Sequence, residues 1–186
     1  MKLLKNLKAT IAVVAFSLPF IGQASAADEI KVGVLFSLTG GLSIVEKSLS
    51  DATLMAIDEI NANGGVDGKM IKPIVEDGAS DPKTFNEKTS KLVIRDRVVT
   101  VFGGYTSASR KAMLPVIEKR KNLLFYPTFY EGYECSKNVI YTGSVPNQQL
   151  NNYIPYLVNK LGKKKFFIVG SNYLFPKEMA KVAKKL

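Results

Sequence analysis

Side chains that could do chemistry gather first in the stretch GGYTSAS, residues 103–109. It follows an apolar run, and its paired glycines let the backbone turn sharply toward the next helix. The hydroxyl of Thr106 or Ser107 would then lie at the helix start, where free backbone N–H groups and the helix dipole favour an oxygen acceptor. An ordinary helix-capping hydroxyl explains this loop equally well.

A second stretch, FYPTFYEG, adds four side chains just past the next strand: Tyr126, Thr128, Phe129 and Tyr130. If the two strands are neighbours, these groups converge with Ser107 on a small polar slot inside an apolar box, as in ligand pockets. Aromatic packing beneath a loop is the alternative. The loop GSNYLFP, residues 170–176, offers Tyr173 from a third strand end.

The composition argues against catalysis and against a bound cofactor. The chain has no histidine, which excludes a Ser-His or Cys-His pair and a histidine zinc site. NGGVDGKM lacks the first glycine of a phosphate loop, and no dinucleotide motif is present. Four carboxylates lie near the loops without a histidine or nucleophile beside them, which makes a catalytic pair a weak hypothesis: Glu76, Asp77, Glu131 and Glu134. The stretch VEDGASDP, which holds the first two, favours turn chemistry and capping. We therefore expect no cofactor and no metal.

Strands and helices alternate along the chain. Apolar runs predict strands over residues 29–38, 69–78, 98–104, 122–127 and 138–143. Between them, helical spacing predicts one helix that ends at Gly64 and Gly65, one capped by Asp81 with Pro82 at its first position, and one over residues 107–120. This order indicates an α/β fold with a parallel sheet, whose ligands lie beyond the carboxyl ends of the strands.

The last residues predict a helix over 148–161, a strand over 164–170 and a helix after Pro176. A lone strand between two helices has no neighbour against which to bury its apolar faces. We therefore expect the sequence to be a piece of a longer protein.

The first residues predict a secretory signal peptide. Lys2, Lys5 and Lys8 precede the apolar run 9–22, and small residues place cleavage after Ala26. The run is shorter than the roughly 20 residues of a membrane span, and no cysteine follows for a lipid anchor. The net charge of +10 is spread along helices, which favours a solvated surface over a nucleic-acid site.

Several motifs together resemble the periplasmic urea and short-chain amide receptors of ABC transporters, which share the type I periplasmic-binding fold with branched-chain amino acid receptors. They are IKVGVLFSLTG, LMAIDEINANGGVDGK, VEDGASDP, TSASRK, YP with YEG, and PNQQ. The resemblance runs from Ile30 to the last residue. It implies two α/β lobes that close on a solute, with residues 27–146 in the first lobe and 147–186 beginning the second.

The resemblance also implies the roles of five side chains. Ser107 and Thr128 match hydroxyls that bind the amide group, Tyr105 and Tyr126 match aromatic walls, and Tyr173 matches a tyrosine from the second lobe. Urea receptors often carry Trp in place of Tyr105 and Val-Gln in place of Thr128 and Phe129. These departures favour the related aliphatic-amide sensor, which is cytoplasmic, whereas this chain carries an export signal.

The expected function is capture of urea or a short aliphatic amide in the periplasm and delivery to a membrane permease. Two alternatives remain. A branched-chain or polar amino acid receptor would need a firm carboxylate and ammonium site, and an exported amidohydrolase would use Cys135 or Ser107 as nucleophile.

Overall fold

The computed structural model describes residues 29–186, so the predicted signal peptide lies outside the described residues. The strands are β1 (Ile30–Phe36), β2 (Ile71–Asp77), β3 (Thr100–Gly103), β4 (Leu124–Tyr126) and β5 (Val139–Tyr141). The helices are α1 (Ser43–Ala62), α2 (Pro82–Ser90), α3 (Ser107–Lys119), α4 (Pro146–Leu150), α5 (Tyr153–Pro155) and α6 (Leu174–Ala183), with π-helical turns η1 (Lys91–Asp96) and η2 (Tyr156–Lys160).

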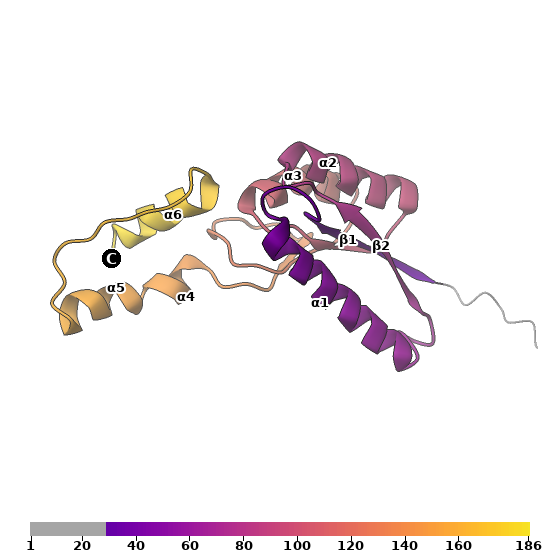
Figure 1. Cartoon of the computed structure of the whole chain (residues 1–186), viewed down its shortest axis with the longest axis horizontal. Coiled ribbons are helices and arrows are strands. Elements are labelled where there is room, and N and C mark those ends of the chain that lie inside the picture. Colours follow the sequence, from indigo (N-terminus) through magenta and orange to yellow (C-terminus); the bar gives the residue numbers. More distant parts are fainter. Residues whose placement is uncertain (1–28) are drawn as a thin grey trace, which may run out of the picture.

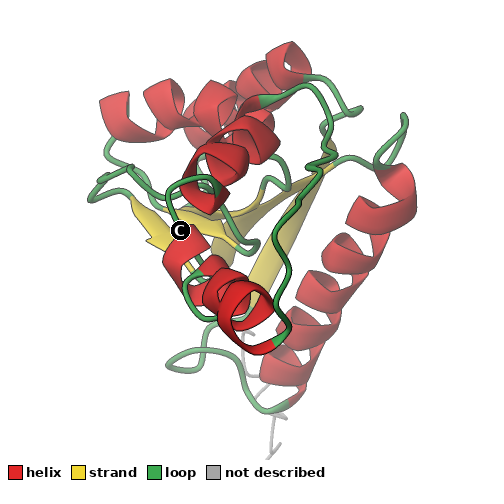
Figure 2. Ribbon diagram, turned by 90° about the vertical axis from the view of Figure 1, so that its left-hand side faces the viewer, coloured by secondary structure: helices red, strands yellow, loops and turns green. Residues whose placement is uncertain are grey.

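The five strands form one parallel sheet in the order β2-β1-β3-β4-β5. Helix α1 lies on one face, and α2 and α3 lie on the other (Figures 1 and 2). The α/β prediction is therefore confirmed. The condition set for the polar slot is also met, because β3 and β4 are direct neighbours in the sheet.

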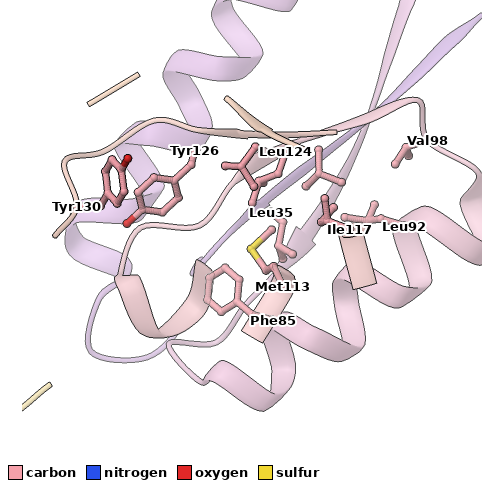
Figure 3. Packing of buried hydrophobic residues seen from close by; sticks show 11 residues of the cluster. Leu35, Phe85, Leu92, Val98, Met113, Ile117, Leu124, Tyr126 and Tyr130 are labelled. Atoms are coloured by element: carbon pink, nitrogen blue, oxygen red, sulfur yellow. The ribbon is translucent and has the colours of Figure 1, made fainter. Parts of the chain in front are cut away.

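The core has one apolar cluster on each face of the sheet. Under α1, Ile57 packs with Val32, Val34 and Phe36. The larger cluster lies under α2 and α3, where Leu35, Met113 and Phe85 meet at the centre and Tyr126 and Tyr130 lie at one end (Figure 3). Alternate residues of β1 serve the two clusters, as a strand covered on both faces requires.

Helix starts follow the local sequence where a capping group is present. As predicted, Asp81 caps α2 and Pro82 is its first residue. The Asp81 carboxylate accepts the Thr84 N–H at 2.8 Å. Helix α1 contacts β1 and β2 at one edge of the sheet and is only partly buried. Ile57 is buried, whereas Ile60 remains 40% exposed.

The prediction for residues 164–170 is wrong, because this segment is extended but belongs to no strand of the sheet. Among residues 29–186 it has no neighbouring strand to satisfy its backbone groups, and Phe167 remains 92% exposed. The helix predicted over 148–161 is broken into α4, α5 and η2, and α6 begins before Pro176. These last elements lie to one side of the sheet, where α6 contacts α4 and α3 (Figure 1).

Candidate functional site

A cavity of about 410 Å³ lies where the carboxyl ends of β1, β2 and β3 meet the start of α6. We call it the strand-end cavity. Its lining includes Leu42, Ser80, Phe85, Tyr105, Thr106 and Tyr173. Two of the five predicted site residues, Tyr105 and Tyr173, therefore line one cavity, although Tyr173 comes from the amino terminus of α6 and not from a strand.

At the start of α3, the capping role belongs to Thr106 and not to Ser107. Thr106 is the N-cap, since its hydroxyl oxygen accepts the Ser109 N–H at 3.0 Å. The Ser109 hydroxyl in turn accepts the Thr106 N–H at 3.1 Å, which completes a capping box. Ser107 is the first helical residue and is left out of this exchange.

The hydroxyl of Ser107 is instead bound by two charged side chains. It donates to Glu131 Oε2 at 2.5 Å and accepts from Arg110 Nη1 at 3.2 Å. Arg110 Nη2 also donates to Glu131 Oε1 at 2.6 Å. Ser107 is buried and is not among the residues that line the strand-end cavity.

Arg110 is the centre of this arrangement, which we call the Arg110 cluster: Ser107, Arg110, Glu131, Glu134 and Tyr141. Its guanidinium is fully buried, and its Nε donates to Glu134 Oε1 at 2.8 Å. It lies over the rings of Tyr126 and Tyr130, at 4.9 and 5.0 Å from their centroids. Aromatic faces and two carboxylates together compensate the burial of this cation.

Glu134 is held from three sides by Arg110, Lys111 and the Tyr141 hydroxyl. Burial alone would raise the pKa of Glu134, but these hydrogen bonds together keep the pKa below its ordinary value. For Tyr141, burial and the Glu134 carboxylate both raise the pKa of the phenol. The carboxylates of Glu131 and Glu134 balance the cations of Arg110 and Lys111, so these four side chains together carry no net charge.

Tyr126, predicted as an aromatic wall, and Thr128, predicted as a ligand-binding hydroxyl, both bind one backbone carbonyl. Tyr126 donates to the Tyr105 carbonyl oxygen at 2.7 Å, and Thr128 donates to the same oxygen at 2.9 Å. Tyr126 is fully buried in the core and forms no exposed wall, and burial raises the pKa of its phenol. Thr128 is half-buried.

Tyr173 lies within electrostatic reach of these groups. Burial raises the pKa of its phenol, and Tyr105, Tyr126 and Glu131 raise it further. Tyr173, a side chain from beyond the sheet, lines the same cavity as Tyr105.

On the side of the cavity formed by the loops after β1 and β2, hydrogen bonds to Asp77 and Ser80 hold the backbone in place. Asp77 Oδ1 accepts the Leu38 N–H at 2.8 Å and the Ala79 N–H at 2.7 Å, and Oδ2 accepts the Thr39 hydroxyl at 2.6 Å. The Ser80 hydroxyl accepts the Leu42 N–H at 3.0 Å. The predicted turn role of Asp77 matches this geometry.

Within residues 29–186, no group of three histidine, cysteine, aspartate or glutamate side chains could hold a metal ion. Over the same range, no helix is long and apolar enough to cross a membrane. Cys135 is exposed and lies in a different hollow, of about 510 Å³, near Tyr133 and Pro146.

The parallel sheet, with hydroxyl and aromatic side chains gathered beyond its strand ends, defines an α/β lobe of the ligand-binding kind. The chain belongs to the periplasmic binding protein domain family, whose model matches residues 30–186. Solved structures of similar fold are type I periplasmic binding proteins.

Three relatives illustrate the likeness. The chain is 30% identical, over 67% of its length, to the leucine-, isoleucine-, valine-, threonine- and alanine-binding protein of Pseudomonas aeruginosa. It is 26% identical, over 94% of its length, to the Leu/Ile/Val-binding protein BraC3 of Rhizobium johnstonii. The isoleucine complex of the branched-chain amino acid transporter substrate-binding protein LivJ from Streptococcus pneumoniae superposes over 84% of this chain, with a TM-score of 0.74 and 26% identity.

The chain spans 32%, 48% and 46% of these three relatives, respectively. All three are named for amino acids or for amino acid transport, and none is named for urea or an amide. The family resemblance is thus confirmed at the level of the fold and the binding-protein family, and the amide ligand stays a prediction.

Sequence reasoning missed the role of Arg110. A signal was present, because Ser107, Arg110, Met113 and Ile117 recur at helical spacing and place Arg110 on the buried face of α3. A buried arginine requires carboxylate partners, and Glu131 and Glu134 were available in the next loop.

Proposed function

We propose that this chain forms the solute-binding part of an exported receptor that delivers a small organic solute to an ABC transporter permease. The observation that carries the proposal is the strand-end cavity, where Tyr105 from the sheet side and Tyr173 from α6 line the same space. A solute held there would contact both parts of the chain, so its binding would favour their closure.

Family membership and the predicted signal peptide support a periplasmic location for this receptor. The predicted division into a first lobe, 27–146, and the start of a second, 147–186, is part of the same proposal. The position of α4 to α6 beside the sheet supports it (Figure 1). The relatives are named as binding proteins, which favours capture over turnover.

An aliphatic amino acid is the first ligand to test. The relatives' names support it, since the proteins from Pseudomonas and Rhizobium are named for leucine, isoleucine and valine. The amino terminus of α3, near Ser107, would offer backbone N–H groups and a favourable dipole to a carboxylate.

Urea or a short aliphatic amide is the second candidate, and the charge balance among Arg110, Lys111, Glu131 and Glu134 favours it. The Arg110 guanidinium is already bound by Glu131 and Glu134, and Lys111 is bound by Glu134. The positive charges of Arg110 and Lys111, which lie near Ser107, are therefore already paired with the carboxylates of Glu131 and Glu134. A neutral ligand would not require an additional buried charge to be paired.

Chemical-shift titration of the isotopically labelled, exported protein tests the proposal and separates the two ligands. We expect leucine, isoleucine, urea or acetamide to move the backbone signals of Tyr105, Ser107 and Thr128. Replacement Tyr105→Ala should weaken these shifts, because Tyr105 lines the cavity. The control Tyr133→Ala, at a side chain 86% exposed outside this cavity, should preserve them.

Shifts with leucine and none with urea or acetamide would assign an amino acid, and the reverse would assign an amide. The proposal fails if none of the four probes moves these signals. It also fails if acetamide or urea is consumed with release of ammonia, because the chain would then be an amidohydrolase.

A further inference from the structure

We propose that Glu131 fixes the hydrogen-bond polarity of Ser107, so that the bound solute must present an N–H group to this hydroxyl. The inference rests on the proposed function, because it assumes that Ser107 meets the solute when the two parts of the chain open and close. It assigns a specificity-determining role to Glu131 and a positioning role to Arg110.

The hydrogen bonds of Ser107 can be counted completely. A hydroxyl has one proton and two lone pairs. The proton is donated to Glu131 Oε2 at 2.5 Å, and one lone pair accepts from Arg110 Nη1 at 3.2 Å. One lone pair is left, so Ser107 can accept one more hydrogen bond and can donate none.

Arg110 keeps Glu131 in this orientation. Its guanidinium has donors only, remains charged, and is bound to Glu131 Oε1 at 2.6 Å while its Nε is bound to Glu134. Both Arg110 and Glu131 are buried, so water does not compete for these bonds. The second oxygen of Glu131 is thereby held against Ser107.

The neighbouring hydroxyls have the same polarity. Tyr126 and Thr128 both give their protons to the Tyr105 carbonyl oxygen, at 2.7 and 2.9 Å. Their remaining capacity is that of acceptors. Ser107 and Thr128, from two adjacent strand ends, therefore offer lone pairs and no protons, and the buried Tyr126 has the same polarity beneath them.

A solute oxygen facing Ser107 would meet a lone pair, whereas an amide N–H or an ammonium N–H would complete the hydrogen bonding of Ser107. Sites that pair a polar group of the ligand reject analogues that lack it, because the protein group is left unpaired. We expect roughly tenfold weaker binding when the N–H is removed at constant size.

The first test compares probes of matched size on the exported wild-type protein. Isobutyramide and N,N-dimethylacetamide have the same number of heavy atoms, and N,N-dimethylacetamide has no N–H. Leucine and 4-methylpentanoate differ by the amino group alone. Chemical-shift titration should show that isobutyramide binds about tenfold more tightly than N,N-dimethylacetamide, or leucine more tightly than 4-methylpentanoate by a similar factor.

The second test is Glu131→Gln. Arg110 requires an acceptor, so the glutamine oxygen should face Arg110 and its NH₂ group should face Ser107. Ser107 would then accept a hydrogen bond from the glutamine NH₂ group, and its own O–H would be free to donate a hydrogen bond to the solute. The preference for the N–H probe should shrink at least fivefold.

Glu134→Gln is the matched control. Glu134 binds the same guanidinium but has no hydrogen bond to Ser107, so its replacement disturbs an ion pair of Arg110 without changing the polarity of Ser107. We expect this variant to keep the wild-type preference.

The outcomes are distinguishable. If isobutyramide and N,N-dimethylacetamide bind equally, and leucine and 4-methylpentanoate do too, the inference is overturned while the proposed function stands. It is also overturned if Glu131→Gln and Glu134→Gln change the preference alike. If Glu131→Gln does not fold, the wild-type probe pairs still decide. If no probe binds, the proposed function fails together with the inference.

Discussion

The guanidinium of Arg110 stands between two carboxylates and over three phenol rings, in a site that water does not reach. Such a cation contributes little net stability when all partners are present, because its desolvation offsets much of the attraction. Removing it is different, since two buried carboxylates lose their main partner. The cluster therefore specifies the position of the 128–134 loop more than it adds to overall stability.

Arg110→Met should lower the free energy of unfolding by about 3–5 kcal/mol, because Glu131 and Glu134 would remain buried without the guanidinium. Chemical denaturation followed by circular dichroism measures this. The control is Lys111→Met, at a side chain 46% exposed, where we expect less than about 1 kcal/mol. Equal effects of the two replacements would show that the buried guanidinium has no special role.

Glu46 is a second buried carboxyl, at the first turn of α1. Its Oε2 accepts the Ser37 N–H at 2.6 Å, and among the described residues its Oε1 has no hydrogen-bond partner. Burial raises the pKa of Glu46, hydrogen bonds from Ser37 oppose this, and the nearby Asp77 raises it further. The folded protein thus holds a proton on Glu46 more tightly than the unfolded chain does.

A raised pKa contributes stability that is complete below the unfolded value, about 4.3, and is lost as pH rises through the folded value. Glu46→Gln keeps an acceptor for Ser37 and is neutral at every pH. The stability of the wild type relative to Glu46→Gln should therefore fall as pH rises from about 4 to 8. Denaturant midpoints across this range measure it. A difference that is constant, or that grows with pH in favour of the wild type, would contradict the assignment.

The junction between β3 and α3 depends on a glycine. Gly103 has φ of +155°, and a Cβ there would lie 2.0 Å from the Leu35 carbonyl oxygen of the adjacent strand. This close approach lets β3 pair with β1 and then turn, so that Thr106 and Ser107 begin α3 at the strand-end cavity. The same turn was predicted from the paired glycines.

Gly103→Ala should cost roughly 3 kcal/mol or more, because the clash involves backbone on both sides and cannot be relieved by a rotamer change. Thermal or denaturant unfolding measures the loss. Gly41→Ala is the matched control, since its added Cβ would meet nothing within 4 Å, and it should leave stability nearly unchanged. A mild Gly103→Ala would show that the β1–β3 approach is looser than described.

Elements defined by local chemistry could be predicted from the sequence, and elements defined by distant partners could not. Asp81 and Pro82 specify the start of α2 through their own neighbours. Residues 164–170 have the composition of a strand, but strand formation needs an adjacent strand, which the described residues do not supply. In the candidate site, the glycine turn and the position of Tyr105 could be predicted from the sequence. The contact of Ser107 with Glu131 could not, because it forms only when the 128–134 loop folds over α3.

The whole molecule divides into a sheet covered by α1 to α3 and a C-terminal part, α4 to α6, beside it (Figures 1 and 2). The two parts differ in burial. β1, β3 and β4 contain fully buried residues, whereas Phe167 and Val169 are 92% and 84% exposed. Stability should therefore be uneven along the chain, with the sheet as the cooperative unit.

Hydrogen exchange tests this unevenness. Backbone amides of residues 164–170 should exchange orders of magnitude faster than those of β1 and β3, because the segment is exposed and lies outside the sheet. Mass spectrometry with peptides covering 160–172 and 98–106 measures both in one experiment, so β3 serves as the internal control. Equal protection of the two peptides would mean that residues 164–170 pair as a strand in solution. In that case the strand prediction would be right and the extended, unpaired segment described here would be wrong.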